Sequence, residues 1–160
     1  MADNYIMLNG KRIDLTDEQI KTLMAEEKKN PFERSDCGDY YYIDYCGGVC
    51  ISTEEYTVGD NEFYAVANYC TDKAMMEQRA LHETLNRLLW RYSEEHGGDG
   101  EWNGVDKHWM ITRTDKNIMV NFSYRNKING AVHFKNPEAA LSAIEEIVKP
   151  FIEQHPEFVW

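Results

Sequence analysis

The sequence predicts a single α+β domain over residues 1–160, with a mainly antiparallel sheet packed against one long central helix and a C-terminal helix. Three observations predict this class: strand-like runs joined by short turns, helical runs with one apolar face, and no repeated strand–helix alternation of the kind that builds a parallel sheet. The chain has 160 residues and 42% hydrophobic content, which is enough to bury one core.

The N-terminal residues predict a hairpin followed by a helix. Asn9-Gly10 lies between two apolar runs, and this dipeptide favours the type I′ turn of a hairpin because both central residues need positive φ. Thr16 and Gln19 have the spacing of a capping box, so a helix is expected over residues 17–28.

A second hairpin is expected over residues 39–52, around the turn Gly47-Gly48. A two-residue turn would point Cys46 and Cys50 to opposite faces of the sheet, whereas a three-residue turn would place them opposite each other and permit a disulfide. Reduced thiols are the expectation, because a chain with a core of this size does not need bridges.

The central helix is the strongest helical signal. After a strand or irregular segment over residues 63–70, it is expected to begin at an N-cap, Thr71 or Asp72, and to end near Glu95, before a glycine-rich stretch. At about 100° per residue, one apolar stripe forms the expected core side: Ala74, Leu81, Leu85, Leu88 and Tyr92. The opposite, mainly polar side aligns Met76, Glu83 and Trp90, with Arg79 and Asn86 between them.

The last third predicts a three-stranded meander over residues 108–113, 117–124 and 130–134. A final helix is expected to begin with Asn136 as N-cap and Pro137 at its first position, and Pro150 should kink or end it. Its apolar side is predicted to hold Ala140, Ile144, Ile147, Val148 and Phe151.

The motifs for metal and catalytic chemistry are incomplete. His82 and Glu83 begin the zinc-protease pattern H-E-x-x-H, but Asn86 stands where the second histidine ligand is needed. The stretch DGEWNG resembles the start of a calcium-binding loop, but Met110 replaces its bidentate glutamate. No phosphate-binding loop and no nucleophile elbow is present. We therefore expect no metal, no cofactor, no catalytic residues and no enzymatic activity.

Charge indicates the kind of partner. The net charge is −11, and the stretch from Glu33 to Glu62 contains eight acidic residues but only one basic residue, Arg34. Binding to nucleic acid phosphates is disfavoured, and a basic protein surface would be attracted. Tyrosines lie among these acids and add rigid contact area. The candidate binding surface comprises Asp39, Tyr40, Tyr42, Asp44, Glu54, Glu55 and Tyr56. In the alternative reading, the tyrosines form core on one sheet face and ordinary surface on the other.

A second candidate is a ligand pocket on the central helix. Arg79, Arg87 and Trp90 could stack a base or a sugar. In the alternative reading, Trp90 is simply covered by the C-terminal segment HPEFVW.

Three stretches carry a family resemblance: YYYID before a glycine turn, VANYCTDK with MEQRALHETLNRLLWRYS, and AIEEIVKPFIEQHPEFVW. Together they resemble a group of small accessory proteins encoded by bacterial phages and prophages. Residues 102–134 match only as aromatic-rich strands. No binding or catalytic residues are established for that group, so the resemblance implies only a context, which is a mobile-element protein acting inside the infected cell.

Two function classes follow. The first is an acidic binding protein that inhibits a host protein, such as a CRISPR-type defence nuclease, by occupying its basic nucleic-acid-binding surface. The second is a protein that sequesters a nucleotide immune signal; a phage accessory protein with no defence role is a further alternative. The N-terminus lacks a secretion signal and no segment is long enough to cross a bilayer, so a cytoplasmic location in the bacterial host is expected.

Overall fold

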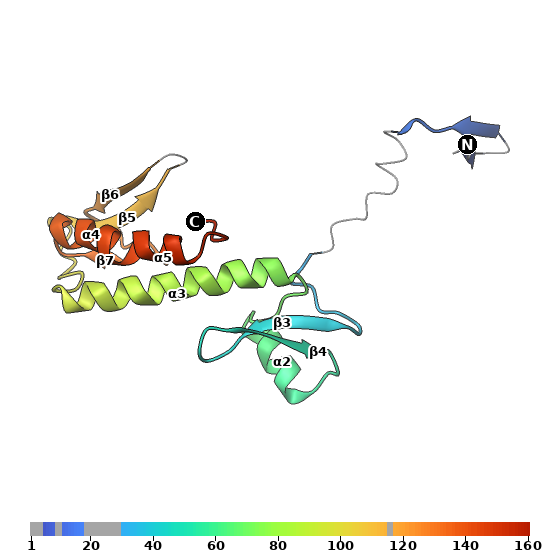
Figure 1. Cartoon of the computed structure of the whole chain (residues 1–160), viewed down its shortest axis with the longest axis horizontal. Coiled ribbons are helices and arrows are strands. Elements are labelled where there is room, and N and C mark those ends of the chain that lie inside the picture. The colour runs from blue at the N-terminus through green and yellow to red at the C-terminus, as the bar shows by residue number, and fades with distance from the viewer. Residues whose placement is uncertain (1–4, 9–10, 18–29, 115–116) are drawn as a thin grey trace.

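The computed structural model describes residues 5–8, 11–17, 30–114 and 117–160, and it has the predicted α+β class with antiparallel sheets (Figure 1). The expected helix over residues 17–28 and the turn residues Asn9 and Gly10 lie outside the described residues, apart from residue 17. The strands are β1 Tyr5–Leu8, β2 Lys11–Asp14, β3 Asp39–Ile43, β4 Val49–Thr53, β5 His108–Arg113, β6 Ile118–Ser123 and β7 His133–Phe134. The helices are α2 Val58–Ala65, α3 Lys73–Glu95, α4 Pro137–Ala143, the π-helical η1 Ile144–Val148, and α5 Lys149–Gln154.

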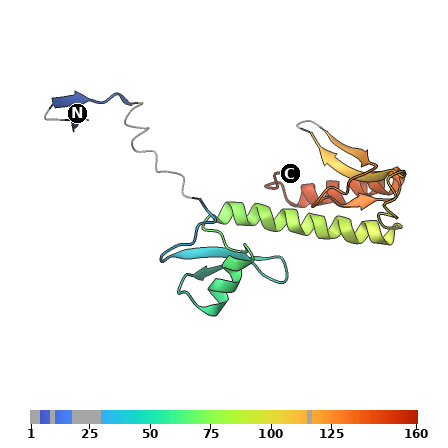
Figure 2. The same cartoon turned by 180° about the vertical axis from the view of Figure 1, so that it is seen from behind.

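Helix α3 separates two lobes. The small lobe, residues 31–72, holds β3, β4 and α2, and the large lobe, residues 97–160, holds β5 to β7 and the C-terminal helices. Figures 1 and 2 show the two lobes on opposite sides of α3, while the β1–β2 hairpin lies apart. The antiparallel pairing of β1 with β2, from Tyr5 opposite Asp14 to Leu8 opposite Lys11, confirms the predicted hairpin.

The ends of α3 are those that the sequence predicts. The Asp72 carboxylate accepts a hydrogen bond from the Met75 N–H at 3.1 Å, which satisfies one of the free donors of the first turn. Beyond the C-cap His96, Gly97 and Gly98 adopt positive φ, which ends the helix.

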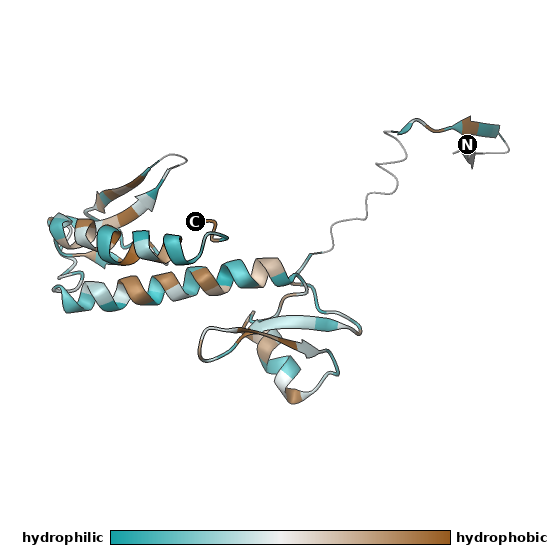
Figure 3. Cartoon of the chain, in the orientation of Figure 1, coloured by the Kyte–Doolittle hydropathy of each residue, from teal (hydrophilic) through white to brown (hydrophobic). Residues whose placement is uncertain are grey.

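Helix α3 buries opposite faces in its two halves. Met76 packs against Ile43 and Cys70 of the small lobe, whereas Leu85 belongs to the core of the large lobe with Phe134. Met76 and Leu85 are nine residues apart, and at about 100° per residue they lie on opposite sides of the helix. Figure 3 accordingly shows hydrophobic residues interspersed with hydrophilic ones along the whole of α3.

This arrangement corrects two predictions for the helix faces. Met76, expected on the polar side, is buried because the small lobe covers that side, and Ala74, expected in the core stripe, is exposed. Leu85 and Tyr92 are buried as predicted, and Leu81 and Leu88 are half-buried against the same core.

The hairpin of the small lobe is covered on both faces. Tyr40 stacks on Tyr69 and Tyr42 stacks on Phe63 of α2, with ring centroids 4.3 and 4.2 Å apart. The alternate residues of β3, Tyr41 and Ile43, pack in the cluster against α3. The alternation of side chains along the strand therefore places successive tyrosines in different contacts.

The loop of this hairpin is longer than either predicted turn. Tyr42 pairs with Cys50 and Ile43 with Val49, so five residues, 44–48, form the loop. The Asp44 carboxylate closes it by accepting hydrogen bonds from the N–H groups of Cys46, at 2.9 Å, and Gly48, at 2.8 Å. Cys46 is exposed in the loop, and all four cysteines are free thiols.

Helix α2 was not predicted, because the sequence indicates a strand or irregular segment over residues 63–70. Thr57 and Asp60 form a reciprocal capping box that begins the helix. Val58 and Gly59, which directly follow Thr57, are poor helix formers and hide this signal. Residues 66–70 are irregular, with one bridge from Cys70 to Tyr41.

The large lobe holds a three-stranded sheet in the order β6-β5-β7. The predicted meander is therefore wrong in its order, because β7 returns to pair with β5, with Trp109 opposite Phe134. The helix begins at Asn136 as predicted, and its predicted apolar residues are buried or half-buried. Pro150 does not end it: the helix continues to Gln154, because a wide π turn precedes the proline, which stands in the first turn of α5.

The burial of Met76 gives a stability prediction. Met76→Ala should lower the free energy of unfolding by ~2–5 kcal/mol, because the side chain is 0% exposed and its removal leaves a cavity. Met75→Ala is the matched control, since Met75 is 41% exposed, and should change the stability by less than ~0.5 kcal/mol. Urea unfolding measures both, and equal effects would contradict the packing of α3 against the small lobe.

Candidate functional site

The residues of the acidic aromatic surface predicted from the sequence do not all lie on the surface of the structure. Tyr40 and Glu54 are buried, and Tyr42 is largely covered by Phe63, so these three residues do not form an exposed binding surface. Asp44 is half-buried and organises its own loop. The residues of the prediction that remain exposed are Asp39, Glu55 and Tyr56.

Glu54 is buried as half of an ion pair with Arg34. Two guanidinium N–H groups donate to the two carboxylate oxygens at 3.0 and 2.9 Å, and the Tyr56 N–H donates to Oε1 at 2.8 Å. The hydrogen bonds from Arg34 lower the pKa of Glu54 and outweigh the opposing effect of burial. Arg34 also donates to Asn61 at 2.7 Å and lies over the ring of Tyr56.

Asp60 is the second buried carboxylate of the small lobe. It accepts hydrogen bonds from the Tyr40 hydroxyl at 2.6 Å, from the Thr57 hydroxyl and N–H, and from the Glu55 N–H. The hydrogen bond from Tyr40 and those from Thr57 and Glu55 lower the pKa of Asp60 to about 2. Burial, together with the bond to Asp60, raises the pKa of Tyr40 to about 12.

These buried groups determine the charge that the small lobe presents to solvent. The one basic residue between Glu33 and Glu62, Arg34, is held by Glu54 and Asn61. The exposed charged residues of that stretch are therefore acidic: Glu33, Asp36, Asp39, Glu55 and Glu62. Tyr45, Tyr56 and Tyr64 are exposed in the same lobe and add aromatic area, although the sequence prediction included only Tyr56 among them.

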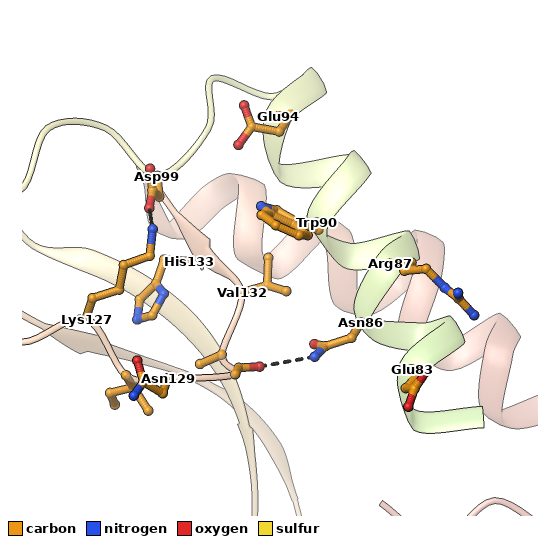
Figure 4. Close-up of a pocket in the computed structure, with 13 residues that line it drawn as sticks. Glu83, Asn86, Arg87, Trp90, Glu94, Asp99, Lys127, Asn129, Val132 and His133 are labelled. Atoms are coloured by element: carbon orange, nitrogen blue, oxygen red, sulfur yellow. Dashed lines mark hydrogen bonds and ion pairs between the residues drawn. The ribbon is translucent and has the colours of Figure 1, made fainter. Parts of the chain in front are cut away.

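The second predicted site is a real pocket, but with a different lining. A cavity of about 410 Å³ lies between α3 and residues 127–133 (Figure 4). Trp90 forms one wall and is 66% exposed. Arg87 contributes to the rim, but its guanidinium points away from the cavity in Figure 4. Arg79 is not part of the lining, because it pairs with Glu83 and donates to the carbonyl of Ala67.

The C-terminal segment does not cover Trp90, contrary to the alternative reading of the sequence. Gln78 donates to the carbonyl of Glu157 at 2.7 Å and accepts from the Val159 N–H at 2.8 Å. Phe158 is buried and lies against the ring of His82, and Trp160 lines a neighbouring hollow with Glu83 and Asn86, so the segment ends beside the cavity without covering Trp90. His82 is thus exposed to solvent, and one side of its ring packs against the edge of the core.

His133 is the feature of the pocket that sequence reasoning missed. It lines the cavity and is 3% exposed, yet neither ring nitrogen has a hydrogen-bond partner in the described part of the chain. Burial lowers the pKa of His133, and the charge of Lys127 acts in the same direction, so the imidazole is neutral at pH 7. The histidines show no paired spacing in the sequence, and only the pairing of β5 with β7 places His133 beside the cavity.

The described residues contain no group of three or more His, Cys, Asp or Glu side chains arranged to hold a metal ion. Asp99, the first residue of the calcium-loop-like stretch, receives hydrogen bonds from Lys127 at 2.6 Å and from the Trp102 indole at 3.2 Å.

Within the described ranges, no helix has the length and apolar character needed to cross a bilayer. The chain matches no protein-family model, no curated protein and no solved structure.

The buried position of Asp60 predicts how stability depends on pH. Its pKa is about 2 in the folded protein and 3.8 is its ordinary value, so between these pH values the unfolded chain binds more protons. The stabilisation from this carboxylate is therefore complete above about pH 4 and is lost as the pH falls towards 2. Urea midpoints measured from pH 5 to pH 2.5 should fall steeply for the wild type and less steeply for Asp60→Asn.

The matched control is Glu62→Gln, an exposed acid on the same helix whose side chain has no hydrogen bond among the described residues. It should retain the wild-type slope. Parallel slopes for the wild type and Asp60→Asn would contradict the hydrogen-bonded carboxylate described above.

Proposed function

We propose that the protein is a non-enzymatic binding protein whose small lobe engages the basic surface of a protein partner. The observation that carries the proposal is the internal use of Arg34, which leaves the exposed charge between Glu33 and Glu62 entirely negative. Such a surface attracts a basic partner over long range and repels nucleic acid.

The class of partner follows from the combination of carboxylates with exposed rings. Carboxylates can stand in for phosphates, and tyrosines such as Tyr45 and Tyr56 for bases, at a surface evolved to bind nucleic acid. From the resemblance that the sequence bears to phage and prophage accessory proteins, we further propose that the target is a host protein. We therefore propose inhibition of a nucleic-acid-binding host protein, with a CRISPR-type nuclease as the first target class to test.

Charge reversal tests the proposal. The variant Asp39→Lys/Glu55→Lys/Glu62→Lys changes three exposed acids of the small lobe and none of the buried carboxylates. Its affinity for a target nuclease should fall at least about tenfold, because each attractive charge pair becomes repulsive. Wild-type affinity should also fall as salt rises from 50 to 500 mM, because screening weakens exposed charge pairs. Surface plasmon resonance against a panel of guide-free CRISPR nucleases measures both effects.

The matched control is Glu101→Lys/Glu153→Lys, which reverses exposed acids of the large lobe and should leave the affinity unchanged. Competition adds a second readout, since target DNA should displace the protein from the nuclease. Binding that is indifferent to salt and to the triple reversal contradicts the proposal, and no binding to any nuclease in the panel rejects this target class.

A further inference from the structure

The pocket beside Trp90 has a chemistry different from that of the acidic small lobe, which approaches it where Gly47 lies close to the rim residue Arg87. We propose that it binds a nucleobase or nucleoside without phosphate, by stacking on Trp90 and hydrogen bonding to His133 at the inner end of the cavity. The ligand would be a second binding partner of the protein, beyond the protein partner proposed above.

Trp90 provides the stacking surface. The residue is 66% exposed in the C-terminal part of α3, and Figure 4 shows its indole facing the space between α3 and the segment that carries Val132 and His133. Exposed tryptophan is a good stacking platform for a planar ring, because every base has an aromatic face. Ile128, Ala131 and Val132 supply the apolar remainder of the wall.

His133 provides a polar group that lacks a partner. A neutral imidazole has one N–H donor and one acceptor nitrogen, and burying both without hydrogen bonds is unfavourable. The ring lines the pocket and lies edge-on to Trp102 at 5.0 Å between centroids. Neither nitrogen has a partner with hydrogen-bond geometry among the described residues, although the backbone of Ala131 acts to raise the pKa of the ring. A donor or an acceptor on the edge of a base can satisfy one of the two ring nitrogens, since these point in different directions.

The charges around the cavity disfavour a phosphate. The carboxylates of Glu83 and Glu94 flank Trp90 along α3, and that of Glu94 has no ion-pair partner in the described part of the chain. Of the two cations in the lining, Lys127 is paired with Asp99 at 2.6 Å, and the guanidinium of Arg87, which points out of the cavity in Figure 4, is turned towards Thr84. A neutral ring with an exocyclic amino group can donate to Glu94, whereas a phosphate would be repelled.

The volume agrees with this class of ligand. About 410 Å³ lies within the usual range of roughly 300–1,000 Å³ for small-molecule sites. Asn86 and Asn129 line the same cavity and add amide groups, although Asn86 already donates to the carbonyl of Gly130 at 3.1 Å. The sequence suggested a nucleotide held by arginines, and the geometry instead points to the uncharged part of such a molecule.

Calorimetric titration of the full chain with adenosine, guanosine, cytidine and uridine, and with the four 5′-monophosphates, tests the inference. At least one nucleoside should bind more tightly than its monophosphate. Trp90→Ala should weaken that binding at least about fivefold through loss of stacking. Glu94→Gln should reduce the difference in affinity between the nucleoside and its monophosphate, since it removes a carboxylate that repels the phosphate.

His133 is tested by NMR, because its imidazole nitrogens should shift when the nucleoside is added if they gain hydrogen bonds. The matched control is Arg91→Ala, which changes an exposed residue of the same helix outside the cavity and should leave nucleoside binding unchanged. Absence of binding by all four nucleosides, tighter binding of the monophosphates, or unchanged binding in Trp90→Ala would overturn the inference.

The two proposals fail separately. The triple charge reversal of the small lobe should leave nucleoside binding intact, and Trp90→Ala should leave nuclease binding intact. Loss of nucleoside binding in the triple reversal would contradict the independence of the two surfaces.

Discussion

The ion pair between Arg34 and Glu54 is the interaction on which the character of the small lobe depends. It takes a carboxylate out of solvent just after β4, and it pairs that carboxylate with the one basic residue between Glu33 and Glu62, which is half-buried. A buried ion pair is weak evidence for stability by itself, because desolvation opposes the attraction. Its consequence here is electrostatic: the exterior between those residues is left with acids alone.

Helix α3 imposes the second constraint. The small lobe covers one side of its N-terminal half, and the large lobe covers the other side of its C-terminal half. Each half of the helix therefore has one face that neither lobe covers fully. Trp90 lies on such a face, next to the segment that leads into β7. The pocket is therefore a product of the two-sided packing, and its rim residue Arg87 lies close to Gly47 in the β3–β4 loop of the small lobe.

The sequence predicts local features well and their assembly less well. The Asn136 and Asp72 caps and the strand over residues 108–113 are confirmed, because each depends on neighbouring residues. Met76 was assigned to the wrong side, since a single helical stripe assumes one covering layer. The burial of Glu54 and Tyr40 could not be predicted, because it depends on Arg34 and Asp60, both twenty residues away. The capping box of Thr57 and Asp60 could have predicted the start of α2, but the poor helix formers Val58 and Gly59 that follow Thr57 argue against a helix there.

The most direct test of the account is the carboxyl titration of Glu54 by carbon-13 NMR, in the wild type and in Arg34→Gln. The ion pair lowers the pKa of Glu54 below its usual range, and removing the guanidinium should raise it. Glu62→Gln serves as a control that leaves the pair intact. A Glu54 carboxyl that titrates in its usual range in the wild type, and does not respond to Arg34→Gln, would place both charges in solvent and contradict an exclusively acidic exterior.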